Sequence, residues 1–123
     1  MDRNFNIYAI DFDGTIVTDK FPEIGEAIPT VQNFIKVRQA QGDKFILWTC
    51  RTKEYLQAAI DYCRSQGIVF DAINCNIPWV TAEYGNDPRK VFADFYIDDK
   101  NTVIVNDLGQ SLTTLRMVGE EDV

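Results

Sequence analysis

Short apolar runs alternate with stretches of helical periodicity along this sequence, and this alternation restricts the fold more than any other feature. Apolar runs of four to eight residues are typical of buried strands, and apolar residues at spacings of three and four predict helices. Strands alternating with helices imply parallel pairing through right-handed crossovers, with helices on both faces of the sheet. We therefore expect a Rossmann-like α/β fold with three layers and about five parallel strands, at residues 6–11, 45–48, 68–73, 94–98 and 102–105.

Helices are predicted between these strands. One covers about residues 28–41, with Pro29 in its first turn and Gly42 as its C-terminal cap. A second follows the second strand and ends at Gly67. The end of the chain predicts a final helix that includes Leu112, Leu115 and Met117.

Two segments lack either pattern. Residues 14–26 contain Pro22 and Gly25, and we interpret them as a short, tight flap. Residues 74–89 are the least regular, and a loop of this length in a compact domain is usually functional. Its Trp79 could contact a partner or substrate, or pack on its own domain; a plain surface excursion is equally compatible with the sequence.

Composition excludes several classes of protein. The 123 residues suit one domain, residues 1–123. A net charge of −7 argues against binding the backbone of nucleic acid. No apolar run is long enough to span a membrane, and the polar start does not resemble a signal peptide. Three cysteines without histidine argue against a zinc site. We therefore expect a cytoplasmic protein in which Cys50, Cys63 and Cys75 are free thiols.

Polar side chains follow three of the predicted strands, at the point where each strand ends. Asp11 and Asp13 follow the first strand, Thr49 follows the second, and Asp98 and Asp99 follow the fourth. Ligands of parallel α/β sheets bind beyond the carboxyl ends of the strands. We therefore expect these groups to converge on one edge of the sheet.

These groups predict phosphate chemistry with a hard cation. Oxygen ligands without histidine or clustered thiolates favour Mg²⁺, with Asp11 and Asp98 as ligands. A carboxylate can then attack phosphorus to form an aspartyl phosphate, while a second carboxylate transfers protons. Thr49 and the amides after it could bind phosphate oxygens, and Arg89 or Lys90 could supply the positive charge.

Each signal also has a plain structural interpretation. Asp13 could end the strand in an Asp-Gly turn, although that leaves Asp11 unexplained. Thr49 could cap a helix, Lys90 could be a solvated surface residue, and Arg51 more often faces solvent than substrate. Their joint order along an alternating chain favours the functional interpretation.

The motifs resemble those of the haloacid dehalogenase-like (HAD) superfamily of phosphatases. Asp11-Phe12-Asp13-Gly14-Thr15 is similar to the first motif of that family, and Trp48-Thr49-Cys50-Arg51 to the second. Lys90 matches the third motif, and Tyr96-Ile97-Asp98-Asp99 the fourth. The resemblance spans about residues 5–105, and it implies the strand order 5-4-1-2-3.

The resemblance also implies roles for individual residues. It makes Asp11 the nucleophile and a metal ligand, and Asp13 the general acid/base with its carbonyl on the metal. Thr49 and Lys90 would bind the phosphate and act as catalytic residues. Gly14, Cys50 and Arg51 would also bind the phosphate. Asp98 would bind Mg²⁺, and Asp99 would assist directly or through water.

Many members of that superfamily carry a cap domain, for which this sequence has no room. A capless site needs either a neighbouring subunit or a large substrate to cover it, so a homo-oligomer and a larger phosphorylated partner both stay open beside a small phosphorylated metabolite. Two other classes of protein remain as alternatives: a phospho-receiver domain and an idle, partner-binding domain. A receiver is disfavoured because no acid ends the third predicted strand, at Ile73-Asn74.

Overall fold

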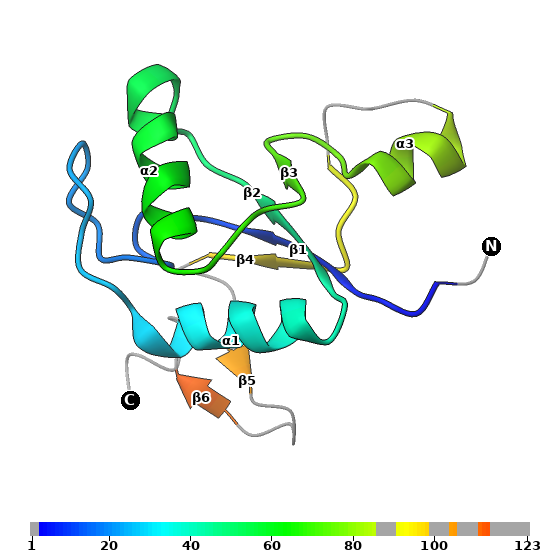
Figure 1. Cartoon of the computed structure of the whole chain (residues 1–123), viewed down its shortest axis with the longest axis horizontal. Helices are drawn as coiled ribbons and strands as arrows, with labels where there is room; N and C mark the ends of the chain where they lie inside the picture. The colour runs from blue at the N-terminus through cyan, green and yellow to red at the C-terminus, as the bar shows by residue number, and fades with distance from the viewer. Residues whose placement is uncertain (1–2, 86–90, 99–103, 106–110, 114–123) are drawn as a thin grey trace, which may run out of the picture.

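The fold is built on a four-stranded parallel sheet, seen in a computed structural model that describes residues 3–85, 91–98, 104–105 and 111–113. The strand order is β3-β2-β1-β4, with β1 in the interior of the sheet (Figure 1). The bounds are Ile7–Ile10 for β1, Lys44–Leu47 for β2, Ala72–Ile73 for β3 and Phe95–Ile97 for β4. These strands confirm the α/β class and the parallel pairing expected from the sequence.

Two helices cover one face of the sheet. The first, α1, spans Pro29–Ala40, and α2 spans Lys53–Ser65. Both end before a glycine with positive φ, Gly42 at 100° and Gly67 at 84°, a conformation that glycine adopts without steric cost. Their apolar residues form one core with the side chains of the sheet that face them, including Tyr8, Ile10, Phe34, Ile35, Phe45, Leu47, Ala59 and Cys63.

A third helix lies on the other face. This helix, α3, spans Pro78–Tyr84 and buries Ile77 and Val80 against β1, β2 and β3 in a second, smaller core. It lies beyond the starting ends of the strands, and the arrowheads point away from it (Figure 1). The prediction of an irregular 74–89 loop was therefore wrong for α3, because seven residues are too few to show a helical repeat. Trp79 packs edge-on against Phe5, with 5.6 Å between ring centroids, which is the structural alternative left open for it.

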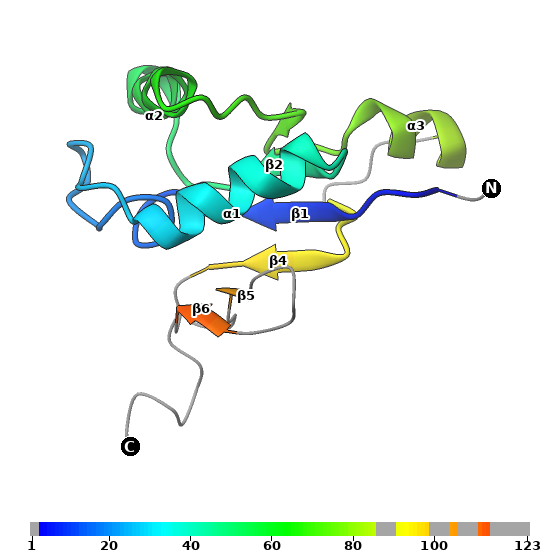
Figure 2. The ribbon, with the colours of Figure 1, turned by 60° about the horizontal axis from the view of Figure 1, so that its bottom comes forward.

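The expected fifth parallel strand was wrong, and with it the order 5-4-1-2-3, because the parallel sheet has the four-strand order β3-β2-β1-β4. Residues Ile104–Val105 form β5, which pairs antiparallel with β6, Ser111–Thr113, in a separate two-stranded sheet. This sheet lies next to α1 (Figure 1). Figure 2 shows it below β4. The intervening Asn106-Asp107-Leu108-Gly109 sequence is rich in turn formers, which favours a hairpin over a crossover. The strand at 111–113 also contradicts a final helix that includes Leu112; Leu115 and Met117 lie outside the described residues.

The third strand is shorter than expected. Of residues 68–73, only Ala72–Ile73 pair with β2. Asp71 instead turns its carboxylate toward the sheet, where Oδ2 accepts the Phe45 N–H at 2.9 Å. Ile68 still packs in the core, whereas the side chain of Val69 faces solvent. Within the described ranges, no helix is long and apolar enough to cross a membrane.

Candidate functional site

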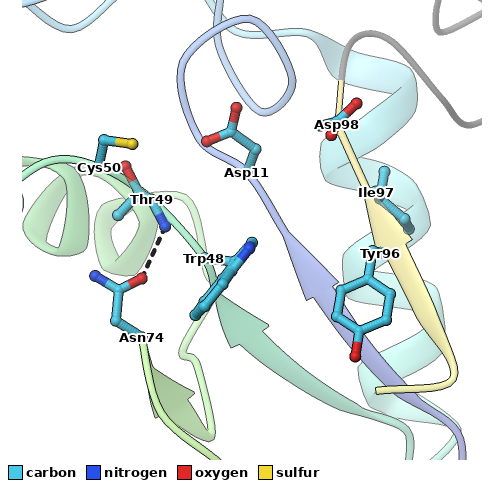
Figure 3. Close-up of a pocket in the computed structure, with 8 residues that line it drawn as sticks. All are labelled: Asp11, Trp48, Thr49, Cys50, Asn74, Tyr96, Ile97 and Asp98. Atoms are coloured by element: carbon cyan, nitrogen blue, oxygen red, sulfur yellow. Dashed lines mark hydrogen bonds between the residues drawn. The ribbon is translucent and has the colours of Figure 1, made fainter. Parts of the chain in front are cut away.

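A pocket of about 680 Å³ opens at the carboxyl ends of the parallel strands. Four of the residues singled out in the sequence line it, namely Asp11, Thr49, Cys50 and Asp98. Figure 3 shows Asp11 between Thr49 and Asp98, at the tips of three neighbouring strands. The expected convergence of these polar groups is therefore present in the structure.

The strand register explains why Asp11 and Asp98 lie close together. Ile10 pairs with Ile97, and the Asp11 N–H continues the ladder by donating to the Ile97 carbonyl oxygen at 2.9 Å. Asp11 and Asp98 thus follow paired residues of adjacent parallel strands. The Asp11 carboxylate is oriented locally, because its Oδ1 accepts the Phe12 N–H at 2.8 Å.

Thr49 is held from two sides. Its N–H donates to Asn74 Oδ1 at 2.8 Å, and its Oγ1 accepts the Arg51 N–H at 3.1 Å. Asn74 adopts a left-handed conformation with φ of 53°, which asparagine tolerates better than most residues. The hydroxyl of Thr49 keeps its own proton for donation to a ligand in the pocket.

Asp13 is bound to a buried arginine. Arg51 is 2% exposed, and it donates from Nε to Asp13 Oδ2 at 2.8 Å and from Nη2 to Asp13 Oδ1 at 2.7 Å. The hydrogen bond to Asp13 is the main reason that the pKa of Arg51 is raised. This two-pronged pair is the strongest geometry available between a guanidinium and a carboxylate.

The other donors of Arg51 bind main-chain oxygens. Nη1 donates to Pro22 at 3.1 Å and to Tyr55 at 3.2 Å, and Nη2 donates to Glu23 at 2.9 Å. All five N–H groups of the guanidinium therefore have protein acceptors. Arg51 faces neither solvent nor the pocket, in contrast to both interpretations of the sequence.

This pairing separates Asp13 from the pocket. Asp13 and Gly14 are absent from the residues that line it. Gly14 instead serves the turn after β1, with φ of 84° and its N–H donating to the Val17 carbonyl oxygen at 2.8 Å. The residues that begin the flap are thus held by contacts within the protein.

Two carboxylates of the pocket are the groups that would hold a magnesium ion. Mg²⁺ in proteins is commonly bound through one or two carboxylates, with water and substrate completing the shell. Asp11 and Asp98 supply that number. No group of three His, Cys, Asp or Glu side chains able to hold a metal occurs in the described part of the chain. Asp99, Arg89 and Lys90 lie outside the described residues.

The cysteines differ in environment. All three are free, as expected; Cys50 and Cys75 are exposed and Cys63 is buried. Burial raises the pKa of the Cys63 thiol to about 12, so this side chain is a neutral part of the core. Cys50, which lines the pocket, is the thiol placed to meet a ligand there.

Sequence reasoning missed the rest of the lining, which comprises Trp48, Asn74, Tyr96 and Ile97. Asn74 could have been found by the rule that identified Asp11, since it follows β3 as Asp11 follows β1. The sequence predicts Trp48 in a buried strand and Tyr96 in a strand, and both side chains are partly exposed.

The chain resembles a solved structure over most of its length. Neither a protein-family model nor a curated protein matches it. A structure of a conserved protein from Bacteroides thetaiotaomicron shares 41% sequence identity, covering 80% of this chain and 79% of that one, with a TM-score of 0.70. The chain belongs to the same family as this protein. The description of the Bacteroides thetaiotaomicron protein as conserved names no activity, so function has to be inferred from the site.

Proposed function

We propose that this protein is a Mg²⁺-dependent phosphomonoesterase of the HAD-like type, with Asp11 as the nucleophile. The observation that carries the proposal is the convergence of Asp11, Thr49 and Asp98 on one pocket. The match of the first motif to Asp-x-Asp-Gly-Thr supports it, as does the position of the pocket at the ends of parallel strands.

The reaction follows from the groups in the pocket. The Asp11 carboxylate attacks phosphorus, and the bond from phosphorus to the leaving oxygen breaks. Water then attacks the aspartyl phosphate, its phosphorus–oxygen bond to Asp11 breaks, and orthophosphate and the free carboxylate result. Thr49 donates its hydroxyl to a phosphate oxygen. Mg²⁺ held by Asp11 and Asp98 would neutralise phosphate charge.

Positive charge and proton transfer come from residues outside the described pocket lining. Lys90, and Arg89 beside it, remain the proposed cations for the phosphate. Asp13 is proposed to transfer protons, which requires its carboxylate to leave Arg51. Arg51 itself is better assigned to holding Asp13 than to binding phosphate, because its five donors are taken.

The test is phosphate release from p-nitrophenyl phosphate with Mg²⁺. We expect turnover that EDTA abolishes and that Asp11→Asn lowers by roughly 10⁴-fold or more. Asp61→Asn is the control, since Asp61 is an exposed acid on α2 whose side chain is 60% accessible. Full activity in Asp11→Asn would refute the role of Asp11 as the nucleophile. Absence of turnover on a wide panel of phosphate esters would refute the phosphomonoesterase function.

A phospho-receiver domain is the second candidate, and the structure disfavours it. Asn74 follows the third strand and lines the pocket, but it carries no carboxylate to phosphorylate. Here β3 pairs with β2, whereas receiver-like sheets have the order 2-1-3-4-5, in which β3 pairs with β1. Stable labelling by acetyl phosphate at a residue other than Asp11 would favour the receiver.

A further inference from the structure

Two aromatic side chains are exposed inside the candidate site. Trp48 is 39% exposed and Tyr96 is 37% exposed, and both line the same pocket as Asp11. Figure 3 shows them on either side of β1, below the level of the Asp11 and Asp98 carboxylates. Large aromatic surface left open next to reactive groups is a common means of binding the organic part of a ligand.

The sheet register places both rings on one face. Ile46 and Ala9 lie in the smaller core, and side chains alternate along a strand, so Trp48 and Asp11 face the same side. Tyr96 pairs with Ala9 and faces that side as well. The methyl group of Ala9 is too small to fill the space between the two rings.

Within the described residues, the packing of α3 does not extend over this part of the face. The side chains of α3 pack on Ile7, Ala9, Ile46 and Ala72, toward the starting ends of the strands. The opposite face, by contrast, is covered by both α1 and α2. The pocket therefore begins where the cover by α3 ends, and the rings of Trp48 and Tyr96 form its apolar wall.

The ring of Tyr96 is held in place. Its hydroxyl donates to the Val91 carbonyl oxygen, so the polar end of the side chain is bound within the protein. What remains to face the pocket is ring carbon. The wall thus offers flat, apolar contacts beside the carboxylates, and within the described lining it offers no cationic group.

We propose that Trp48 and Tyr96 bind an aromatic ring of the leaving group, so that the preferred substrate is an aryl phosphomonoester. This inference rests on the proposed phosphomonoesterase function. With phosphate between Asp11, Thr49 and Asp98, a ring attached to its bridging oxygen lies over the aromatic wall. Aliphatic leaving groups such as glycerol cannot stack on these side chains.

The reactivity of the leaving group favours the same class of substrate, an aryl phosphomonoester. Asp13 is paired with Arg51 and does not line the pocket, so a leaving group that needs little protonation suits the described geometry. A phenol has a pKa of about 10, as in tyrosine, and departs as an anion far more readily than an aliphatic alkoxide.

The kinetic test compares phenyl phosphate with glycerol phosphate. We expect kcat/KM to favour phenyl phosphate in the wild type, and Trp48→Ala to raise KM for phenyl phosphate about 10-fold or more with little effect on glycerol phosphate. Trp48→Phe should restore most of the loss. Phe95→Ala is the control, because Phe95 is an exposed aromatic of the same strand as Tyr96 that stacks on Tyr8, on the other face. Equal losses for both substrates in Trp48→Ala would overturn the proposal.

A binding test separates this proposal from the activity itself. Phenylphosphonate and methylphosphonate cannot be hydrolysed, and Trp48 and Trp79 are the only two tryptophans. We expect phenylphosphonate with Mg²⁺ to bind about 10-fold or more tightly than methylphosphonate and to change a fluorescence signal that is absent from Trp48→Phe. Equal affinities, or no binding of either, would overturn the aromatic site. Absence of turnover together with the expected binding would instead overturn the phosphomonoesterase function alone.

Discussion

Carboxylates stand at both ends of the parallel sheet, and the two ends use them differently. At the starting end, Asp43, Asp71 and Asp94 each precede a strand. Each accepts a main-chain N–H from the neighbouring strand or from the residue just before it, at 2.7 to 2.9 Å. At the carboxyl end, Asp11 and Asp98 line an open pocket. Aspartate thus fixes strand register at one end of the sheet and lines the candidate site at the other.

Asp13 shows that environment, not position in the sequence, decides which role applies. Asp13 belongs to the carboxyl end, two residues after Asp11. Both of its carboxylate oxygens nevertheless accept hydrogen bonds from Arg51, so Asp13 holds the fold together as the carboxylates of the starting end do. Through Arg51 it is also joined to Pro22 and Glu23 of the flap. In the structure described, Asp13 therefore stabilises the flap.

The largest effect on stability is expected at this pair. Asp13→Ala leaves the Arg51 guanidinium buried without its carboxylate, and removal of one partner of a buried pair is strongly destabilising. We expect a loss of about 3 kcal/mol in the free energy of unfolding, near the lower end of the usual range because 18% of the Asp13 side chain is exposed. Urea denaturation measures the loss.

Asp98→Ala is the control at the same edge of the sheet. If the pocket carboxylates contribute mainly to function, this substitution should change the free energy of unfolding by less than about 1 kcal/mol. Equal losses of unfolding free energy in Asp13→Ala and Asp98→Ala would show that Asp13 and the pocket carboxylates contribute equally to stability.

The sequence was sufficient to locate the pocket but not the Asp13 pair. Asp11, Thr49 and Asp98 could be placed together because the ends of parallel strands meet at one edge. The contact between Asp13 and Arg51 joins residues 38 positions apart and depends on how the flap folds back. Because no periodicity indicates such a contact, the sequence alone predicts that Arg51 faces solvent or binds phosphate.

The fold was predictable to a similar degree. Long elements with clear caps, such as α1 between Pro29 and Gly42, were found within one residue at each end. The errors fall on short elements: α3 has seven residues and β6 has three. For elements of this length, pairing and packing decide between helix, strand and loop, and local pattern does not.

A smaller loss of stability is expected at the starting end of the sheet. Asp43 is 8% exposed, and its carboxylate accepts the Asn6 N–H at 2.8 Å and the Tyr8 hydroxyl at 3.3 Å. Asp43→Ala leaves both donors without this acceptor, which should cost about 2 kcal/mol. A double-mutant cycle with Tyr8→Phe separates the two bonds, because only the hydroxyl bond is lost in both single variants. Strict additivity would show that the hydroxyl bond contributes nothing.

The smallest effect is a change in pH dependence at Asp94. The hydrogen bonds from Arg3, at 2.6 and 2.7 Å, are the main reason that the pKa of Asp94 is lowered, and the Ile7 N–H lowers it further. A carboxylate whose pKa is lower in the folded state stabilises the protein above its unfolded pKa of about 3.9. That contribution is lost as the pH falls through the folded-state pKa.

Asp94→Asn should therefore flatten the fall in unfolding free energy below about pH 4, measured by urea denaturation at a series of pH values. Arg3→Gln should produce part of the same flattening, since it removes the largest cause of the lowered pKa. The side chains of both residues are partly exposed, at 22% and 23%, so added salt should reduce the difference between wild type and variants. If the unfolding free energy of both variants fell below about pH 4 as in the wild type, main-chain pairing alone would hold the register at this end of the sheet.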